Sequence, residues 1–418
     1  MVHLLTHCLV DPATLDVKAA YDLYDPTCGT GGILSDFEAC LHAMGVPKHH
    51  VTSYGQELDP KAIAICKADL LLKGQKPTNI HHGNTLTNDL LRARTFKFIG
   101  ANPPFGVDWK DYKASVEADI TGRFAAGMPR TSDGSMLFIQ HIVHKMDPEG
   151  ARAGVVLHGS PLFSGDAGSG ESEIRRFLIE RDLLDAVIAL PTELFYNTGI
   201  PTFLWILDNK KPDARKGRVQ LIDATHMGTR MKKSQGSKRV ILSSSDIDAV
   251  VKALADNLVQ TADTIADTSA PYLLSNSFDN HTFGARKLTI QVPLAPSEDE
   301  ASSKKKTKTV KYDPALKDSE SLELARVHQL KTADESTLAD ATHKAIAQLL
   351  ASEVLPWQPS AVLDPKTIDA KDRLPGIVGY SINFADLLPH PATSGASACQ
   401  LAACIRTELS QMQAMLSL

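Results

Sequence analysis

The glycine-rich stretch at residues 25–32, Asp-Pro-Thr-Cys-Gly-Thr-Gly-Gly, has the composition of a ligand-binding turn. Three glycines within four positions let the chain turn tightly and bring a ligand close to backbone N–H groups. No lysine follows, as a GxxxxGK(S/T) phosphate loop requires, and the glycines lack the GxGxxG spacing of a dinucleotide fingerprint. Because the Asp25 carboxylate would repel a phosphate, the stretch favours a nucleoside ligand without a pyrophosphate.

Two polar side chains follow the next two apolar runs of the chain. Glu57 ends the run Val-Thr-Ser-Tyr-Gly-Gln-Glu, where a carboxylate can accept hydrogen bonds from both hydroxyls of a ribose. The alternative is a surface glutamate beside the helix start at Asp59 and Pro60, but the position after a second strand favours the ribose. Asn84 follows the third run, where its amide can bond the edge of an adenine ring.

The segment Asn102-Pro103-Pro104-Phe105 closes the fourth run and carries the most specific chemistry. The prolines fix φ and lack N–H donors, so the Asn102 amide and the Pro103 carbonyl form a rigid pair of acceptors. Such a pair can hold the protons of an exocyclic amine and favour its attack on an electrophilic methyl group, while Phe105 stacks on the ring. Alone, the segment could be an ordinary Asn-Pro turn; the three preceding features favour catalysis.

The elements between these groups must bring them together. From residue 20 to about 225, short apolar runs alternate with helical patterns, as in a mainly parallel sheet with helices on both faces. In such a sheet the carboxyl ends of the strands form the ligand-binding crevice. The sequence therefore predicts an α/β fold with seven strands, at 21–26, 51–57, 79–84, 96–104, 153–160, 183–190 and 202–209, and helices that include 61–74, 134–146 and 171–181.

Longer stretches divide the chain further. Residues 106–133 form a long polar loop within the sheet region, and loops of that length are usually functional or unstructured. The later segments predict a strand and a charged linker over 286–311, helix over 319–353, an irregular Pro-rich stretch over 355–392 and an amphipathic helix over 399–418. We expect three parts: a catalytic domain at 1–225, an extension with the charged linker at 226–311, and a largely helical C-terminal region at 312–418.

The composition narrows the class of protein. The 418 residues are 43% hydrophobic and 22% charged, which is ordinary for a globular chain of more than one domain. A net charge of −5 excludes a broad basic face, so any contact with nucleic acid is local or assisted by a partner. The cysteines show no CxxC pair, which fits a reducing cytoplasm, and no apolar run is long enough to span a membrane. We expect no metal site, because His49/His50 and His81/His82 have no carboxylate or thiol at ligand spacing.

The four groups together resemble the motifs of the modification (M) subunit of type I restriction-modification systems, a class I, S-adenosylmethionine-dependent DNA adenine-N6 methyltransferase. Stretches starting at Gly154, Phe283 and Gly379 are also similar to family segments, so the resemblance covers nearly the entire chain. It implies that a target adenine, flipped out of the duplex, is held at Asn102, Pro103, Pro104 and Phe105, with residues 106–133 closing over it. It implies that S-adenosylmethionine is bound by Asp25, Pro26, Thr27, Gly29, Thr30, Gly31, Glu57 and Asn84.

The resemblance also implies partners. These are DNA, a separate specificity (S) subunit that selects the DNA sequence, and a restriction (R) subunit. The resemblance implies that the C-terminal region at 312–418 contacts the S subunit; the apolar face of its amphipathic tail at 399–418 could equally pack on its own core.

The N-terminus departs from the family pattern. The family carries a helical domain and a Phe-Tyr-Thr-Pro-like segment ahead of a helix similar to residues 1–10, and this sequence starts at that helix. Two alternatives to adenine methylation therefore stay open. The chain could be a truncated, catalytically impaired assembly subunit, or it could methylate another planar nitrogen, such as a protein glutamine or an RNA guanine. Phe105, in place of tyrosine, and the later family-like stretches argue against the second alternative.

Overall fold

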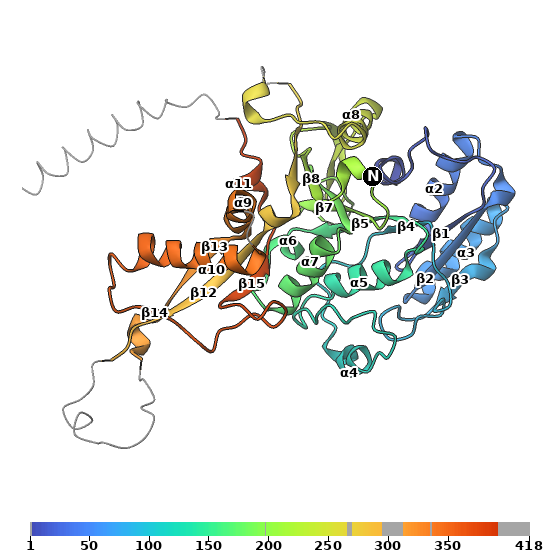
Figure 1. Cartoon of the computed structure of the whole chain (residues 1–418). Helices are drawn as coiled ribbons and strands as arrows, with labels where there is room; N and C mark the ends of the chain where they lie inside the picture. The colour runs from blue at the N-terminus through green and yellow to red at the C-terminus, as the bar shows by residue number, and fades with distance from the viewer. Residues whose placement is uncertain (1, 197, 266–269, 295–311, 335–336, 392–418) are drawn as a thin grey trace, which may run out of the picture.

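A nine-stranded sheet forms the centre of the computed structural model, which describes residues 2–196, 198–265, 270–294, 312–334 and 337–391 (Figure 1). Its strand order is β11-β8-β6-β7-β5-β4-β1-β2-β3. Strands β7 and β11 run against the other seven, which are mutually parallel. The strands are β1 (Tyr21–Asp25), β2 (Val51–Glu57), β3 (Ile80–His82), β4 (Phe98–Ala101), β5 (Arg152–His158), β6 (Leu184–Leu190), β7 (Thr202–Asp208), β8 (Arg218–Asp223) and β11 (Leu274–Asp279).

The α/β prediction and all seven predicted strands are confirmed, because β1 to β7 fall on the seven apolar runs. Strand β6 shows why the sequence predicts these strands: each of its seven residues is buried, because helices cover both faces of the sheet, and a buried strand has a continuous apolar sequence. The sequence missed β8 and β11, which extend the sheet at one side. Strand β11 reads Leu-Ser-Asn-Ser-Phe-Asp, and so few apolar residues give little strand signal.

Helices cover the two faces of the sheet with separate apolar cores. One core includes buried side chains of α1, α2, α3 and α8, and the other includes those of α5 and α7. The helices of this part are α1 (Val2–Leu9), α2 (Gly32–Ala43), α3 (Pro60–Leu72), α4 (Lys113–Glu117), α5 (Ser135–Lys145), α6 (Ser160–Phe163), α7 (Gly170–Glu180) and α8 (Ser244–Ala255). Helix α7 confirms the helix predicted over 171–181, and its N-cap Ser169 accepts a hydrogen bond from the Ser172 N–H.

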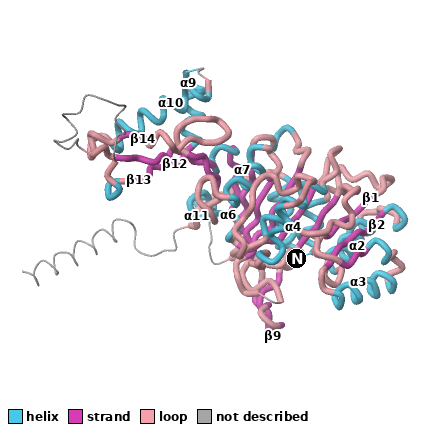
Figure 2. Tube along the Cα trace, turned by 90° about the horizontal axis from the view of Figure 1, so that it is seen from below, coloured by secondary structure: helices cyan, strands magenta, loops and turns pink. Residues whose placement is uncertain are grey.

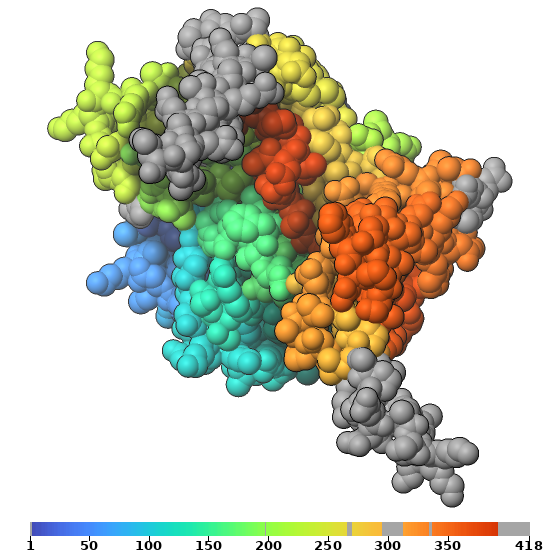
Figure 3. All heavy atoms as spheres, turned by 90° about the vertical axis from the view of Figure 1, so that its left-hand side faces the viewer, coloured from blue at the N-terminus to red at the C-terminus, as the bar shows by residue number. Residues whose placement is uncertain are grey.

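Two antiparallel sheets complete the structure. Strands β9 (Thr229–Gln235) and β10 (Lys238–Ile241) form a hairpin that projects from the main body (Figure 2). The C-terminal part holds a four-stranded sheet and three helices, which lie against the main part in Figure 3. Its elements are β12 (Gly284–Gln291), β13 (Asp318–Glu323), β14 (Val362–Leu363), β15 (Ile377–Tyr380), α9 (Leu324–Asp334), α10 (Leu338–Leu349) and α11 (Phe384–Leu387).

The C-terminal predictions are met in part. Strand β12 confirms the strand expected near residue 286, and α9 and α10 confirm helix within 319–353. The helix predicted over 319–353 is wrong at its start, because residues 319–323 belong to β13, which pairs with β12. The stretch 355–392, predicted to be irregular, contains β14 and β15, which also pair with β12, and α11. The amphipathic tail at 399–418 lies outside the described residues. The division of the chain at residues 225 and 311 stays a prediction.

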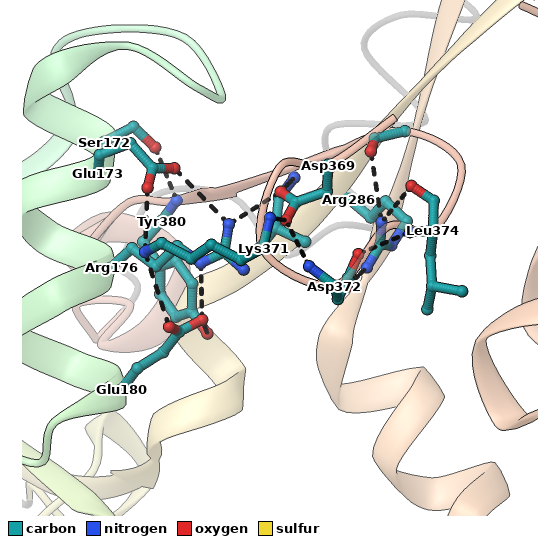
Figure 4. A network of polar contacts seen from close by, with 12 residues as sticks. Ser172, Glu173, Arg176, Glu180, Arg286, Asp369, Lys371, Asp372, Leu374 and Tyr380 are labelled. Carbon is teal, nitrogen blue, oxygen red and sulfur yellow. Dashed lines mark hydrogen bonds and ion pairs between the residues drawn. The ribbon is translucent and has the colours of Figure 1, made fainter. Parts of the chain in front are cut away.

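Ion pairs and hydrogen bonds attach the C-terminal part to helix α7 (Figure 4). The Arg176 guanidinium lies 2.8 Å from the Asp369 carboxylate, and Lys371 lies 3.0 Å from Glu173. The Tyr380 N–H donates to Ser172 Oγ at 3.1 Å. Arg176 and Asp369 are both buried, whereas Lys371 is exposed, so the attachment combines one desolvated charge pair with an ion pair at the surface. Among all helices described, none combines the length and apolarity needed to cross a membrane.

Candidate functional site

The predicted site residues meet at the carboxyl edge of the large sheet, where a cavity of about 360 Å³ opens. Strands β1, β2 and β4 are parallel, so the residues that follow them emerge at the same edge. Seven of the predicted residues line the cavity: Pro26, Thr27, Gly29, Glu57, Asn84, Asn102 and Pro104. The cavity therefore joins the predicted cofactor residues to the predicted catalytic residues. A larger groove of about 720 Å³, lined by residues such as Ser35, Lys48 and Gln75, contains no predicted site residue.

The remaining predicted residues do not line the cavity: Asp25, Thr30, Gly31, Pro103 and Phe105. Each is a sequence neighbour of a lining residue or, for Gly31, lies two residues beyond one. Thr30 is exposed, whereas Asp25 and Pro103 are buried. The structure thus brings the motifs together but places these five behind or beside the cavity wall.

The Glu57 carboxylate connects the glycine-rich turn to the start of helix α3. Its Oε2 accepts a hydrogen bond from the Gly29 N–H at 2.8 Å. Its Oε1 accepts from the N–H groups of Leu58 and Asp59 at 2.7 and 2.8 Å. Since a carboxylate has about four acceptor positions, these three bonds leave capacity for a ligand hydroxyl.

Asp25 ends β1 directly before the lining residues Pro26 and Thr27. It is 1% exposed, and its Oδ1 accepts from the Thr27 N–H at 2.9 Å. Its Oδ2 is buried and has no hydrogen-bond partner within the described part of the chain. Burial raises the pKa of Asp25 to about 7; the Thr27 N–H opposes this shift and the Glu57 carboxylate adds to it. This unpartnered acceptor lies directly behind the lining residues Pro26 and Thr27, so its charge acts on the cavity through the wall.

The glycine-rich turn depends on glycine at two positions. Gly29 has φ +52° and Gly31 has φ +84°, the left-handed region that other residues rarely adopt. A Cβ on Gly31 would lie 2.6 Å from Cys66 Sγ, so helix α3 packs directly against the turn. The Thr85 hydroxyl holds the other side by donating to the Pro26 carbonyl at 2.6 Å. The turn is therefore fixed by its neighbours, with Gly29 at the cavity.

The Asn102–Phe105 segment leaves the end of β4 with its polar groups free. Asn102 and Pro104 are exposed and line the cavity, while Pro103 is buried. Neither the Asn102 side chain nor the Pro103 carbonyl has a hydrogen-bond partner among the described residues. The two acceptors that the sequence predicted are thus available to a ligand.

Phe105 rests against a histidine–aspartate pair, half-buried His158 and buried Asp133, that the sequence did not reveal. The Phe105 and His158 rings meet edge-to-face, with centroids 5.8 Å apart. His158 ends β5, and its Nε2 lies 3.2 Å from an Asp133 carboxylate oxygen. Although burial alone would raise it, hydrogen bonds from His158 and Ser135 hold the pKa of Asp133 at about 2. The pair supports Phe105 from behind; only the position of His158 at a strand end could have pointed to it.

The predicted loop at 106–133 is a packed segment, with Trp109 buried in a small apolar cluster. The buried Arg123 anchors it: its guanidinium donates to the carbonyls of Thr85 and Leu86 at 2.8 and 2.6 Å. The Leu86 N–H in turn donates to Asn84 Oδ1 at 2.9 Å. The loop is therefore tied to the segment that holds Asn84, the residue predicted to contact adenine. It also supplies further cavity-lining residues that sequence reasoning missed: Val107, Asp108, Trp109 and Tyr112.

A buried polar chain continues from Arg123 into the core. Arg123 lies 3.0 Å from His141 Nδ1, and the Tyr24 hydroxyl lies 2.9 Å from His141 Nε2. Burial and the Arg123 cation hold the pKa of His141 well below its usual range. The ring is therefore neutral, with Nδ1 accepting from Arg123 and Nε2–H donating to Tyr24.

One cluster of potential metal ligands lies away from the cavity. His3, His7 and Cys40 present ligand atoms within 4.8 Å of one another. Sequence spacing could not reveal it, because Cys40 comes from α2 and the histidines from α1. Cys40 Sγ lies 3.6 Å from His3 Nδ1, so a weak hydrogen bond between the two helices accounts for part of this arrangement.

The sheet order, the reversed β7 and the motifs after β1, β2 and β4 define a class I methyltransferase fold. The chain belongs to the N-6 DNA methylase family, whose model matches residues 1–270.

Several relatives carry more specific names. The chain is 31% identical over 250 residues to the type I restriction enzyme MjaIX methylase subunit of Methanocaldococcus jannaschii, which covers 59% of this chain and 43% of the relative. It is 30% identical over 251 residues to the HindI methylase subunit of Haemophilus influenzae, covering 59% and 53%. The chain thus matches about half the length of these relatives.

A solved structure supports the fold. The type I restriction-modification methyltransferase subunit of Streptococcus thermophilus superposes with a TM-score of 0.54 at 24% identity, covering 62% of this chain and 52% of that one.

Proposed function

We propose that this chain transfers a methyl group from S-adenosylmethionine to the N6 amine of adenine in DNA, as the modification subunit of a type I restriction-modification complex. One observation carries the proposal: a single cavity is lined by the glycine-rich turn, Glu57 and Asn84 and also by Asn102 and Pro104. Membership of the N-6 DNA methylase family and the names of the relatives support this acceptor over a protein glutamine or an RNA guanine.

The cavity wall fits S-adenosylmethionine. Glu57 has acceptor capacity left for a ribose hydroxyl after its three backbone hydrogen bonds. Behind the wall, next to the lining residues Pro26 and Thr27, Asp25 Oδ2 is a buried acceptor without a partner in the described structure, and its charge would attract the ammonium and sulfonium of the cofactor. Gly29 has open space where a Cβ would stand, so a ligand can reach the backbone there. Asn84 would contact the adenine ring, and Pro26, Thr27, Thr30 and Gly31 would shape the turn around the ligand.

The bound cofactor would supply an electrophilic methyl group, and the chain's own residues would prepare the amine. Asn102 Oδ1 and the Pro103 carbonyl would accept the two N6 protons of a flipped adenine, which favours a more tetrahedral nitrogen. Phe105 would stack on the base, held from behind by His158. Pro104 would fix the backbone between the two acceptors and Phe105, so that the distance between the acceptors and the ring stays constant.

The partners are part of the proposal. The relatives are named as type I methylase subunits, which supports a complex with DNA, a specificity subunit and a restriction subunit. Such a complex would act on DNA in the cytoplasm. A net charge of −5 fits a subunit that relies on partners for much of its DNA contact.

Two measurements on the full chain test the proposal. Isothermal titration with S-adenosylmethionine should show binding; no detectable binding would instead support a catalytically impaired assembly subunit. Methyl transfer to DNA, measured with the specificity subunit present, should fall about 100- to 1,000-fold in Asn102→Ala while the cofactor Kd stays within about twofold. Asn79→Ala, before β3 at the opposite edge of the sheet, is the matched control and should keep full activity. Activity surviving in Asn102→Ala would remove Asn102 from the mechanism.

A further inference from the structure

The β9–β10 hairpin is a strongly basic element on an acidic protein. Residues 229–241 contain five cations and no carboxylate, whereas the whole chain has a net charge of −5. The cations are Arg230, Lys232, Lys233, Lys238 and Arg239. Six of the seven residues of β9 are exposed, and the hairpin projects from the main body (Figure 2). An isolated two-stranded hairpin has only marginal stability, and this one buries few side chains. Its five cations therefore do not serve the packing of the fold, and another role has to account for them.

The hairpin stands at the same edge of the sheet as the cavity. Strands β6 and β8 are parallel to β4, so the segments after Leu190 and Asp223 emerge at the carboxyl edge. The β6–β7 connection holds the hairpin there: the Glu193 carbonyl accepts from the N–H groups of Arg239 and Val240 at 2.8 and 3.1 Å. Its orientation is thereby fixed relative to the sheet.

The separation from Asn102 suits a DNA duplex. Strand β6 lies three positions from β4 in the sheet, through β7 and β5. At about 4.8 Å per strand this is roughly 15 Å along the edge. At about 3.4 Å per base pair, a duplex following this edge from Asn102 would present phosphates to the hairpin roughly four to five base pairs away.

Two of the cations are free to meet phosphates. Arg230 and Arg239 share the Glu193 carboxylate, at 3.3 and 3.4 Å, and Lys238 lies 4.7 Å from the Tyr196 ring centroid. Lys232 and Lys233, by contrast, have no ion-pair partner among the described residues. Arg230, Arg239 and Lys238 therefore stabilise the hairpin against the β6–β7 connection, whereas Lys232 and Lys233 are exposed to solvent.

We propose that the β9–β10 hairpin binds the DNA phosphate backbone beside the target base, with Lys232 and Lys233 as its main contacts. The inference rests on the proposed function for the identity of the acceptor and adds the surface by which this chain holds it. Phosphate contacts position a duplex without reading its sequence. This role is compatible with sequence choice residing in a separate subunit.

Salt-dependent DNA binding of the full chain tests the hairpin. Fluorescence anisotropy with a labelled 30-base-pair duplex, across a KCl series from 50 to 300 mM, gives the slope of log K against log salt, about −0.9 per phosphate contacted. Lys232→Ala/Lys233→Ala should lower the magnitude of the slope by about two and weaken binding at least tenfold at 100 mM KCl. Lys232→Arg/Lys233→Arg should keep both values, since it keeps the charge.

The matched control removes the same charge at the opposite edge of the sheet. Lys48 and Lys76 are exposed and precede β2 and β3, so Lys48→Ala/Lys76→Ala should leave the slope unchanged. An equal slope change in both alanine pairs, or no binding by the unsubstituted chain at 50 mM KCl, would overturn the inference. Methyl transfer and cofactor binding are measured separately from DNA binding. If the unsubstituted chain methylates DNA but Lys232→Ala/Lys233→Ala leaves the salt slope unchanged, only the role of the hairpin is wrong. If the slope depends on the two lysines but the chain does not methylate DNA, only the proposed reaction is wrong.

Discussion

The Gly29 N–H donates a hydrogen bond of 2.8 Å to the carboxylate of Glu57, which joins the turn after β1 to the end of β2. The residue expected to accept from the ribose is thus also the residue that sets the position of the turn. Backbone N–H groups of Leu58 and Asp59 hold the other carboxylate oxygen. Any change at Glu57 therefore acts twice, through a lost ligand contact and through a loosened turn.

Glu57→Gln should weaken S-adenosylmethionine binding about 10- to 100-fold. The substitution keeps the size of the side chain but replaces the charged acceptor, and hydrogen bonds to charged groups contribute about 1.5–3 kcal/mol. Isothermal titration of the full chain measures the change. Glu149→Gln, an exposed glutamate before β5, is the control and should bind as the unsubstituted chain does. A Glu57→Gln Kd within twofold of the control would show that Glu57 does not contact the cofactor.

The pKa of Asp25, raised by burial to about 7 from a usual value near 3.8, predicts a pH dependence of stability. The folded state favours the protonated carboxyl, so this contribution to stability is fully present below about pH 4 and is lost as the pH rises through 7. Asp25→Asn cannot ionise and should be more stable than the unsubstituted chain at pH 8 by on the order of 2–4 kcal/mol, but not at pH 4. Urea unfolding at several pH values gives the free energy of unfolding of both proteins. If the two proteins depended on pH in the same way, the pKa of Asp25 would not be raised in the folded state.

The same residue predicts how cofactor binding depends on pH. The positive charge of a cofactor in the cavity beside Asp25 would favour the ionised carboxylate, so we expect binding below pH 7 to release a proton. The S-adenosylmethionine affinity should fall as the pH drops from 7 to 5, by up to about tenfold per unit, and level off above 7. Asp25→Asn should bind weakly at every pH. Titration calorimetry in two buffers with different ionisation enthalpies would detect the proton release.

The sequence could predict what depends on local pattern and strand order. Buried runs such as β6 and strand-end groups such as Glu57 and Asn102 follow from periodicity and from the parallel direction of neighbouring strands. If the strands that carry these side chains are parallel neighbours, their carboxyl ends lie at one edge of the sheet, and the side chains that follow them must meet there. The cofactor and catalytic motifs can therefore be predicted to meet, whereas their exact contacts cannot be predicted from the sequence.

The residues that sequence reasoning missed are fixed by contacts between distant segments. Arg123 lies in a stretch with weak periodicity, and its partners Thr85 and Leu86 are more than 35 residues away. His158 gains its role only because β5 lies beside β4, which brings it to Phe105. The hairpin cations lie within the ten residues from Arg230 to Arg239 but are interrupted by uncharged residues, and they gather only when β9 pairs with β10.

Phe105→Ala should lower kcat/KM for DNA about 10- to 100-fold and leave the cofactor Kd within about twofold. Stacking of an extruded base on an aromatic ring contributes about 1–3 kcal/mol, and alanine removes the ring. Phe105→Tyr keeps the ring and should retain activity within severalfold. Initial rates of methyl transfer at varied DNA concentration give the values. If the alanine and tyrosine variants were equally active, Phe105 would not stack on the target base.

Arg123→Ala should destabilise the chain by about 3–5 kcal/mol, because the buried carbonyls of Thr85 and Leu86 and the Asp119 carboxylate would lose their shared donor. Arg123→Lys keeps the charge, but a lysine cannot reach all of these partners at once. Its free energy of unfolding should therefore lie between those of the unsubstituted chain and Arg123→Ala. Urea unfolding measures both against Arg92→Ala, an exposed arginine expected to change stability by no more than about 0.5 kcal/mol. Cofactor affinity should fall with Arg123→Ala as well, since Thr85 also holds Pro26 through its hydroxyl. Equal unfolding midpoints for Arg123→Ala and Arg92→Ala would show that loop 106–133 is held to the cavity by its apolar cluster alone.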